Sequence, residues 1–188
     1  MDSQLSNKGE IVLNNITWER FKKIKASFDD VPSVGLTYAT GILEIKSQVN
    51  RAHELIKTNM RLLLEIYMRE KGIRFHRSGR VAMELEGDVY GEPDESYAIV
   101  SDKAVPDITI DFLNNDGNFN KLNVYKKKQV PEAWFWKINR IRIFQLTGED
   151  YQEAGESLLF PNLNVNILRR YIQYPDHSKA MQRFQMTI

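Results

Sequence analysis

The chain has 188 residues, a formal net charge of +1 and no cysteine. This length allows one domain with a buried core, while the balanced charge gives no long-range attraction to nucleic acid or to an anionic membrane. Without cysteine there can be no disulfide framework, no cysteine-bound zinc and no thiol nucleophile, and this composition is typical of a reducing compartment.

The distribution of apolar residues indicates neither a signal peptide nor a membrane span. The start of the chain is polar, and the longest apolar stretches hold a few residues, whereas a bilayer requires roughly 20. We therefore expect a cytoplasmic protein with a single domain over residues 1–188. Residues 1–12 are predicted to be a loose N-terminal arm and residues 174–188 a C-terminal extension.

The N-terminal half of the chain predicts a short helix, two strands and a long helix. Thr17 is a candidate N-cap, and Gly72 stands where a C-terminal cap belongs. Apolar residues recur at helical spacing in the stretch that ends at Gly72. The expected elements are a helix at 18–28, strands at 35–38 and 41–45 around a tight turn at 40–41, and a helix at 49–71.

The C-terminal half predicts more strands, interleaved with short helices. The expected elements are strands at 73–75, 81–85, 96–100 and 107–113, a loop at 87–93, a helix at 119–128, a hairpin of 132–136 with 140–144, a helix at 163–171 and a last helix from 175–176. This order favours one α/β or α+β domain around a mixed central sheet, with the long helix covering one face.

Two carboxylates occupy positions where the local pattern does not favour them. Asp111 interrupts the apolar strand 108–113, and acids are seldom buried without a partner. Asp94 opens the preceding strand. If the two strands are neighbours, both carboxylates converge at one end of the sheet. Two close acids favour a hard divalent cation such as Mg2+, which takes oxygen ligands and can activate water for attack on a phosphodiester.

A nearby lysine would complete such a site by orienting the water and neutralising the developing charge. In the usual motif this lysine lies two residues after the acid, but position 113 is leucine. We therefore choose Lys121, in the next helix, because its stem lies beside the apolar stripe of that helix.

Structural roles are open alternatives at each position. Asp94 is also typical of a turn aspartate after proline, and Asp111 of a buried acid paired with a structural Arg or Lys. Lys121 is also typical of an exposed helical lysine. Arg140 and Arg142 fit a solvated face better than a phosphate contact.

Five segments, in this order, resemble the Uma2 family of restriction-endonuclease-like proteins. They are GILEI at 41–45, EPDESY at 92–97, VPDITID at 105–111, NKLNVY at 120–125 and VPEAWFW at 130–136. The resemblance covers about residues 17–172, and the ordered set is more specific than any one motif.

The resemblance implies a restriction-endonuclease-like core of the PD-(D/E)xK superfamily, namely a mixed central sheet flanked by helices with additional antiparallel strands. It implies hydrolysis of phosphodiester bonds in DNA with Mg2+ or Mn2+. By position, Asp94 and Asp111 fall on metal-binding acids and Lys121 on the lysine moved into the following helix. Glu44 falls on a further acidic position that supports the site.

One departure from the family pattern concerns the second acid. Relatives usually carry Glu where this chain has Asp111, and a shift of about 1 Å can cost on the order of 100-fold in rate. The alternative function is therefore a nuclease fold without catalysis that acts as a nucleic-acid or protein interaction module. A small-molecule or metal-binding protein is a third possibility, and a homodimer is compatible with a nuclease that cuts two strands.

Overall fold

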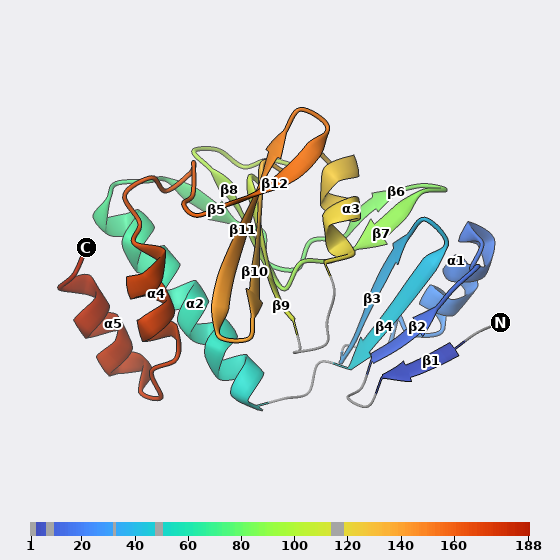
Figure 1. Ribbon diagram of the computed structural model, residues 1–188, viewed down its shortest axis with the longest axis horizontal. Helices are drawn as coiled ribbons and strands as arrows, with labels where there is room; N and C mark the ends of the chain where they lie inside the picture. Colours follow the sequence, from blue (N-terminus) through green and yellow to red (C-terminus); the bar gives the residue numbers. More distant parts are fainter. Residues whose placement is uncertain (1–2, 7–9, 32, 48–50, 114–118) are drawn as a thin grey trace.

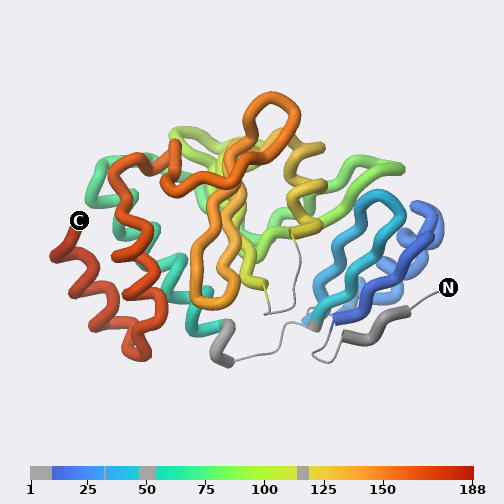
Figure 2. The backbone as a smooth tube through the Cα atoms, in the orientation of Figure 1, coloured from blue at the N-terminus to red at the C-terminus, as the bar shows by residue number. Residues whose placement is uncertain are grey.

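Two six-stranded sheets and five helices make up the computed structural model, which describes residues 3–6, 10–31, 33–47, 51–113 and 119–188 (Figure 1). Strand β1 and helix α5 lie at opposite ends of the molecule. Along the long axis of the molecule, helix α3 is positioned between the two sheets, as the backbone tube shows (Figure 2). The combination of a mixed sheet, a second sheet and helices confirms the expected α+β class around a mixed central sheet.

The N-terminal sheet is antiparallel throughout the described pairs. Its strands, in spatial order, are β1 (Ser3–Ser6), β2 (Glu10–Leu13), β4 (Ile42–Ser47), β3 (Val34–Ala39), β7 (Val89–Gly91) and β6 (Met83–Leu85). Thr40 and Gly41, with φ of 51° and 79°, connect β3 to β4. Two central residues with positive φ match the tight hairpin turn that the sequence predicts.

The central sheet is mixed. Its strands, in spatial order, are β12 (Asp150–Ala154), β11 (Arg140–Thr147), β10 (Glu132–Lys137), β9 (Ile108–Phe112), β8 (Glu95–Ile99) and β5 (Phe75–Arg77). Strands β9 and β10 are parallel, and the other neighbours are antiparallel. A parallel pair needs a crossover connection, and α3 lies in the connection between β9 and β10.

Helices cover both faces of the central sheet (Figure 1). The helices are α1 (Trp18–Ala26), α2 (Arg51–Glu70), α3 (Lys121–Lys127), α4 (Val165–Ile172) and α5 (His177–Gln185). Helices α2, α4 and α5 pack on one face, α3 packs on the other, and α1 packs on the N-terminal sheet. No described helix combines the length and apolar character that crossing a membrane requires.

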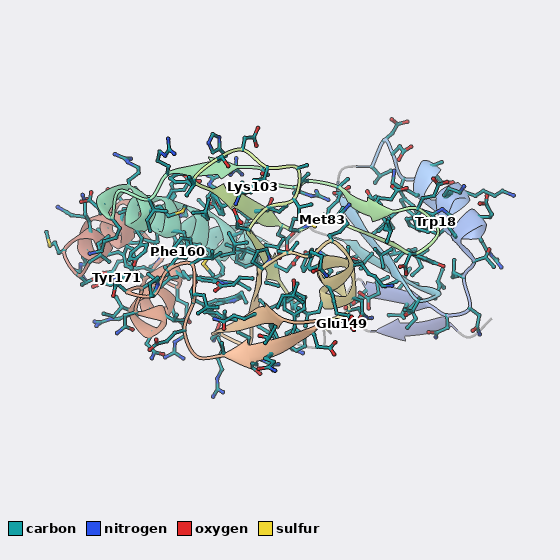
Figure 3. The ribbon with its side chains drawn as sticks, turned by 90° about the horizontal axis from the view of Figure 1, so that it is seen from above. Trp18, Met83, Lys103, Glu149, Phe160 and Tyr171 are labelled. Atoms are coloured by element: carbon teal, nitrogen blue, oxygen red, sulfur yellow. The ribbon has the colours of Figure 1, made fainter. Side chains whose placement is uncertain are left out.

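Three groups of buried apolar side chains follow one another along the molecule. The helix-side core lies between the central sheet and α2, α4 and α5, and includes Phe160. The middle core lies under α3 and includes Met83. The outer core lies between the N-terminal sheet and α1 and includes Trp18. Figure 3 shows Phe160, Met83 and Trp18 in this order along the long axis.

Most expected elements are present with small shifts of their ends. The helix at 18–28 is α1, whose N-cap Thr17 accepts a hydrogen bond from the Arg20 N–H. The long helix is α2, and its apolar side packs on the central sheet as expected. The hairpin of β10 and β11 turns at Ile138 and Asn139, which both have positive φ. The last helix is α5, capped by Asp176.

Three segments differ from the expectation, and each contains strands that pair with neighbouring strands. The expected loop at 87–93 contains β7, a three-residue strand that pairs with β3 and β6. The expected loose arm at 1–12 contains β1 and most of β2, and β2 pairs with β4. Strand β12 was not expected, because its mostly exposed polar residues carry no alternation of apolar side chains.

Candidate functional site

Asp111 is a buried carboxylate near the C-terminal end of β9, an inner strand of the central sheet. Side chains of a strand alternate between its two faces. Ile110 and Phe112 pack in the helix-side core, whereas Leu113 belongs to the middle core on the side of α3. Asp111 shares the face of Leu113, as the sequence predicts, and its side chain is 1% exposed. A carboxylate this deeply buried requires partners.

Helix α3 supplies two partners for the Asp111 carboxylate. The Lys121 amine is ion-paired with Oδ1, and the Tyr125 hydroxyl donates a hydrogen bond to Oδ2. Lys121 and Tyr125 are four residues apart, so they lie on the same side of the helix. Because α3 belongs to the crossover after β9, it carries both groups back over the strand that holds Asp111.

Asp94 directly precedes β8, the strand next to β9. Strands β8 and β9 are antiparallel with Glu95 opposite Ile110, and Asp94 directly precedes Glu95 while Asp111 directly follows Ile110. Asp94 Oδ2 accepts a hydrogen bond of 2.9 Å from the Phe112 N–H. The two carboxylates thus converge at one end of the sheet, and the condition that the strands be neighbours is met.

Lys121 has a second partner in the segment before β8. Its Nζ donates a hydrogen bond of 2.6 Å to the main-chain carbonyl of Glu92. Its side chain is 13% exposed and that of Asp94 is 12% exposed, so these two groups reach the surface more than Asp111 does. The lysine chosen from the sequence therefore faces inward, as expected, and is not the exposed helical lysine of the alternative.

The pKa values of the Asp111 carboxyl, the Lys121 amine and the Tyr125 hydroxyl depend on burial and on the neighbouring charges. Burial raises the pKa of the Asp111 carboxyl; Lys121 opposes this rise and the negative charge of Asp94 adds to it. Burial tends to lower the pKa of the Lys121 amine, but the carboxylates of Asp111 and Asp94 outweigh it, so that pKa is raised. Burial and the Asp111 carboxylate also raise the pKa of the Tyr125 hydroxyl well above its ordinary value. Lys121 is thus a cation and Tyr125 a neutral hydrogen-bond donor near pH 7.

Glu44 is connected to this cluster through Asn120. It is buried in β4, where its Oε1 accepts a hydrogen bond from the side-chain amide of Asn120. Asn120 directly precedes Lys121 and the first turn of α3. Glu44 therefore contacts the segment that carries Lys121, which is compatible with a supporting role.

A divalent cation fits the donor set of this cluster. Asp94 and Asp111 supply oxygen ligands, and one or two carboxylates are the usual protein contribution to Mg2+. Burial is the main cause of the raised pKa of Asp111, the negative charge of Asp94 adds to it, and a bound cation would relieve that repulsion. In the described part of the chain, no three His, Cys, Asp or Glu side chains group closely enough to hold a metal by themselves. Water and a phosphate oxygen would have to complete the coordination.

Three residues of the cluster were not identified from the sequence. Tyr125 looks like a member of the apolar stripe of its helix, but its four-residue distance from Lys121 places both on one side of the helix. Glu92 contributes a main-chain oxygen, for which the sequence has no signal. Lys57, in α2, lies with its Nζ 3.8 Å from Asp94 Oδ1. Only the packing of α2 on the sheet brings Lys57 there.

Comparison with known proteins gives one family. The family model described as "Uma2: Putative restriction endonuclease" matches residues 18–171, a range that contains all four candidate site residues. No curated protein matches the chain significantly.

Proposed function

The chain belongs to the Uma2 family, and from this membership we propose that it is an endonuclease that hydrolyses phosphodiester bonds in DNA with Mg2+ or Mn2+. The observation that carries the proposal is the convergence of Asp94, which directly precedes β8, with Asp111 of β9 and Lys121 of α3. Two carboxylates and a lysine at one sheet end supply ligands for a cation and a positive charge for a phosphate.

Asp94 and Asp111 are the proposed metal ligands. A bound cation supplies polarisation of the phosphodiester and a lowered pKa for a bound water. The Phe112 N–H holds Asp94 Oδ2, and the Tyr125 hydroxyl holds Asp111 Oδ2. Each carboxylate is thus oriented by a partner that is part of the rigid sheet or of the helix above it.

Lys121 is the proposed cationic residue of the reaction. The carboxylates of Asp111 and Asp94 raise its pKa, so it is a cation near pH 7. Its charge would stabilise the negative charge that grows on the phosphoryl oxygens as water attacks phosphorus and one P–O bond breaks. Its hydrogen bond to the Glu92 carbonyl fixes the amine on the side of Asp94.

Glu44 is proposed as a positioning residue. Its contact with Asn120 lies one residue before Lys121 and would hold the start of α3. It has no assigned contact with the phosphate or the metal in this proposal.

The test is cleavage of supercoiled plasmid DNA by the purified protein with Mg2+ or Mn2+. The wild-type protein should cleave, EDTA should abolish cleavage, and Asp111→Asn and Lys121→Ala should each reduce the rate on the order of 100-fold or more. Equal traces of cleavage in all three proteins would identify a contaminant. That result would favour an interaction module without catalysis.

A homodimer is part of the same proposal, because two copies can cut both strands of a duplex. Sedimentation velocity with and without a duplex oligonucleotide tests it. A monomer under both conditions would restrict the protein to one cut per encounter.

A further inference from the structure

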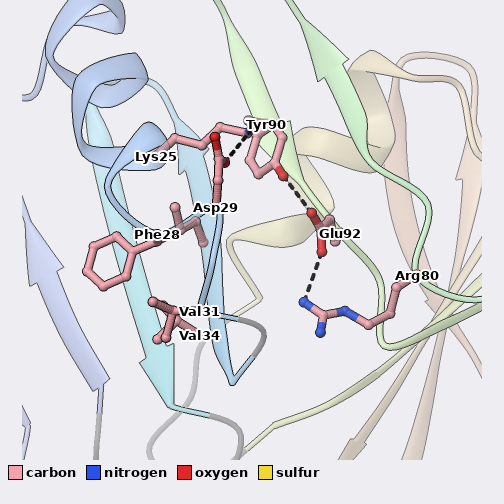
Figure 4. Close-up of a pocket in the computed structure, with 9 residues that line it drawn as sticks. Lys25, Phe28, Asp29, Val31, Val34, Arg80, Tyr90 and Glu92 are labelled. Carbon is pink, nitrogen blue, oxygen red and sulfur yellow. Dashed lines mark hydrogen bonds and ion pairs between the residues drawn. The ribbon is translucent and has the colours of Figure 1, made fainter.

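A cavity of about 360 Å³ lies beside the candidate site (Figure 4). One wall comes from the end of α1, the turn after it and β3. The other comes from β7 and the segment that holds Arg80 and Glu92. Its volume is within the range of sites that hold small organic groups.

The wall next to β3 is apolar. It is lined by Phe28, Val31, Val34 and Leu36, and Val31 is 38% exposed. Apolar side chains on this wall can contact the face of a flat group.

The polar groups of the cavity carry balanced charge. Lys25 and Arg80 are positive, and Asp29 and Glu92 are negative. Arg80 is ion-paired with Glu92 at 2.9 Å, and Glu92 also accepts a 2.5 Å hydrogen bond from the Tyr90 hydroxyl (Figure 4). A cavity with this balance does not select a phosphate. It offers hydrogen-bond donors and acceptors to a neutral group.

Glu92 connects the cavity to the candidate site. Its carboxylate lines the cavity, while its main-chain carbonyl accepts the hydrogen bond from Lys121 Nζ. Asp94 follows two residues later, and two residues span at most about 7 Å of chain. A group in the cavity therefore lies close to a phosphate bound at Asp94 and Lys121.

We propose that this cavity receives an unpaired nucleobase next to the scissile phosphate, so that the substrate strand is single-stranded at the point of cleavage. The inference rests on the proposed function. A base is neutral and flat, and its edge carries both donors and acceptors, which match the apolar wall and the mixed charges. A base inside a duplex is stacked and cannot enter a concave site unless it leaves the stack.

The test measures equilibrium binding in EDTA, where no cleavage occurs. Fluorescence anisotropy compares a single-stranded oligothymidylate, an abasic strand of the same length and a duplex. The variant Val31→Trp fills the cavity from an exposed position. The control Leu158→Trp adds the same side chain at a site that is 75% exposed and outside the cavity lining.

The wild-type protein and Leu158→Trp should bind the oligothymidylate on the order of tenfold more tightly than the abasic strand, which is the size of effect expected for one stacked base. Val31→Trp should lose this difference and keep its thermal midpoint and its affinity for the duplex. Equal binding of the two single strands by the wild-type protein, or an unchanged preference in Val31→Trp, would overturn the inference.

The two proposals fail in different ways. If plasmid cleavage is absent but the base preference disappears in Val31→Trp, the cavity binds a base and the nuclease proposal is wrong. If cleavage depends on Asp111 but the wild-type protein binds the oligothymidylate and the abasic strand equally, the nuclease proposal stands and the inference about the cavity is wrong.

Discussion

The Asp94 carboxylate accepts a hydrogen bond from the main-chain N–H of Phe112 at 2.9 Å, which ties the start of β8 to the strand residue that follows Asp111. This bond fixes one oxygen of Asp94 beside the second acid. Substitutions at Asp94 can therefore test the effect of this hydrogen bond and the effect of the negative charge separately.

Replacing Asp94 by Asn keeps an oxygen acceptor for the Phe112 N–H and removes the negative charge. We expect nuclease activity to fall on the order of 100-fold or more, while the free energy of unfolding changes by less than about 1 kcal/mol. Asp94→Ala should lose activity and, in addition, about 1 kcal/mol of stability, because the N–H loses its partner. Plasmid cleavage and urea denaturation of the two variants check this. An active Asp94→Asn protein would show that the charge is not needed.

Removing Lys121 should destabilise the fold, because it leaves the Asp111 carboxylate buried without a counter-charge. We expect Lys121→Ala to cost about 3 kcal/mol, as for other broken buried pairs. The matched control is Lys103→Ala, whose ion pair with Asp107 is 2.7 Å long but whose lysine is 40% exposed. That change should cost less than about 1 kcal/mol. Urea denaturation compares them, and the cost of Lys121→Ala should shrink in an Asp111→Asn background.

Local patterns in the sequence single out one acid and the lysine as candidates. Asp111 stands in an apolar strand, and Lys121 stands beside the apolar stripe of a short helix. Lys57 could not be predicted as their neighbour, because no local feature links residue 57 of α2 to the start of β8. The contact exists only because α2 packs across the central sheet.

The same distinction applies to the fold. The hairpin of β3 and β4 and the helix α1 follow from turn and cap residues that are adjacent in sequence. Strand β7 has three residues between turn signals, and its pairing with β3 joins residues about fifty positions apart. Such a strand is stabilised by its neighbours and not by its own composition.

The hydroxyl of Tyr125 should stabilise the folded state more than an ordinary tyrosine hydroxyl does, because its acceptor is a buried carboxylate. We expect Tyr125→Phe to cost about 1.5–3 kcal/mol, the range for hydrogen bonds to charged groups. Tyr151→Phe is the control, since that hydroxyl donates a 2.6 Å bond to the neutral carbonyl of Val130. It should cost about 1 kcal/mol. Tyr125→Phe should also lower nuclease activity, whereas Tyr151→Phe should not. Equal effects on activity would contradict a role for Tyr125 in orienting Asp111.

The raised pKa of Asp111 predicts a specific pH dependence of stability in EDTA. A carboxyl whose pKa is higher in the folded state holds its proton more tightly there than in the unfolded chain. Its contribution is full below the ordinary value of 3.8 and is lost as pH rises through the raised pKa. The wild-type protein should therefore lose stability relative to Asp111→Asn as pH rises from about 4. Urea denaturation across this range measures the difference. A relative gain by the wild-type protein would mean that Lys121 dominates and lowers the pKa of Asp111.

The contact between Glu44 of β4 and Asn120, the N-cap of α3, predicts that substitutions at these two residues are coupled. If Glu44 acts by holding the start of α3, then Glu44→Ala and Asn120→Ala should each lower activity about tenfold, and the double variant should be no worse than either single one. Fully additive losses would show that the two side chains act separately. The control is Glu10→Ala, which removes another buried glutamate of the N-terminal sheet, paired with Lys46 at 3.3 Å. That variant should lose stability and keep its activity per folded molecule, because Glu10 does not contact the segment that carries Lys121.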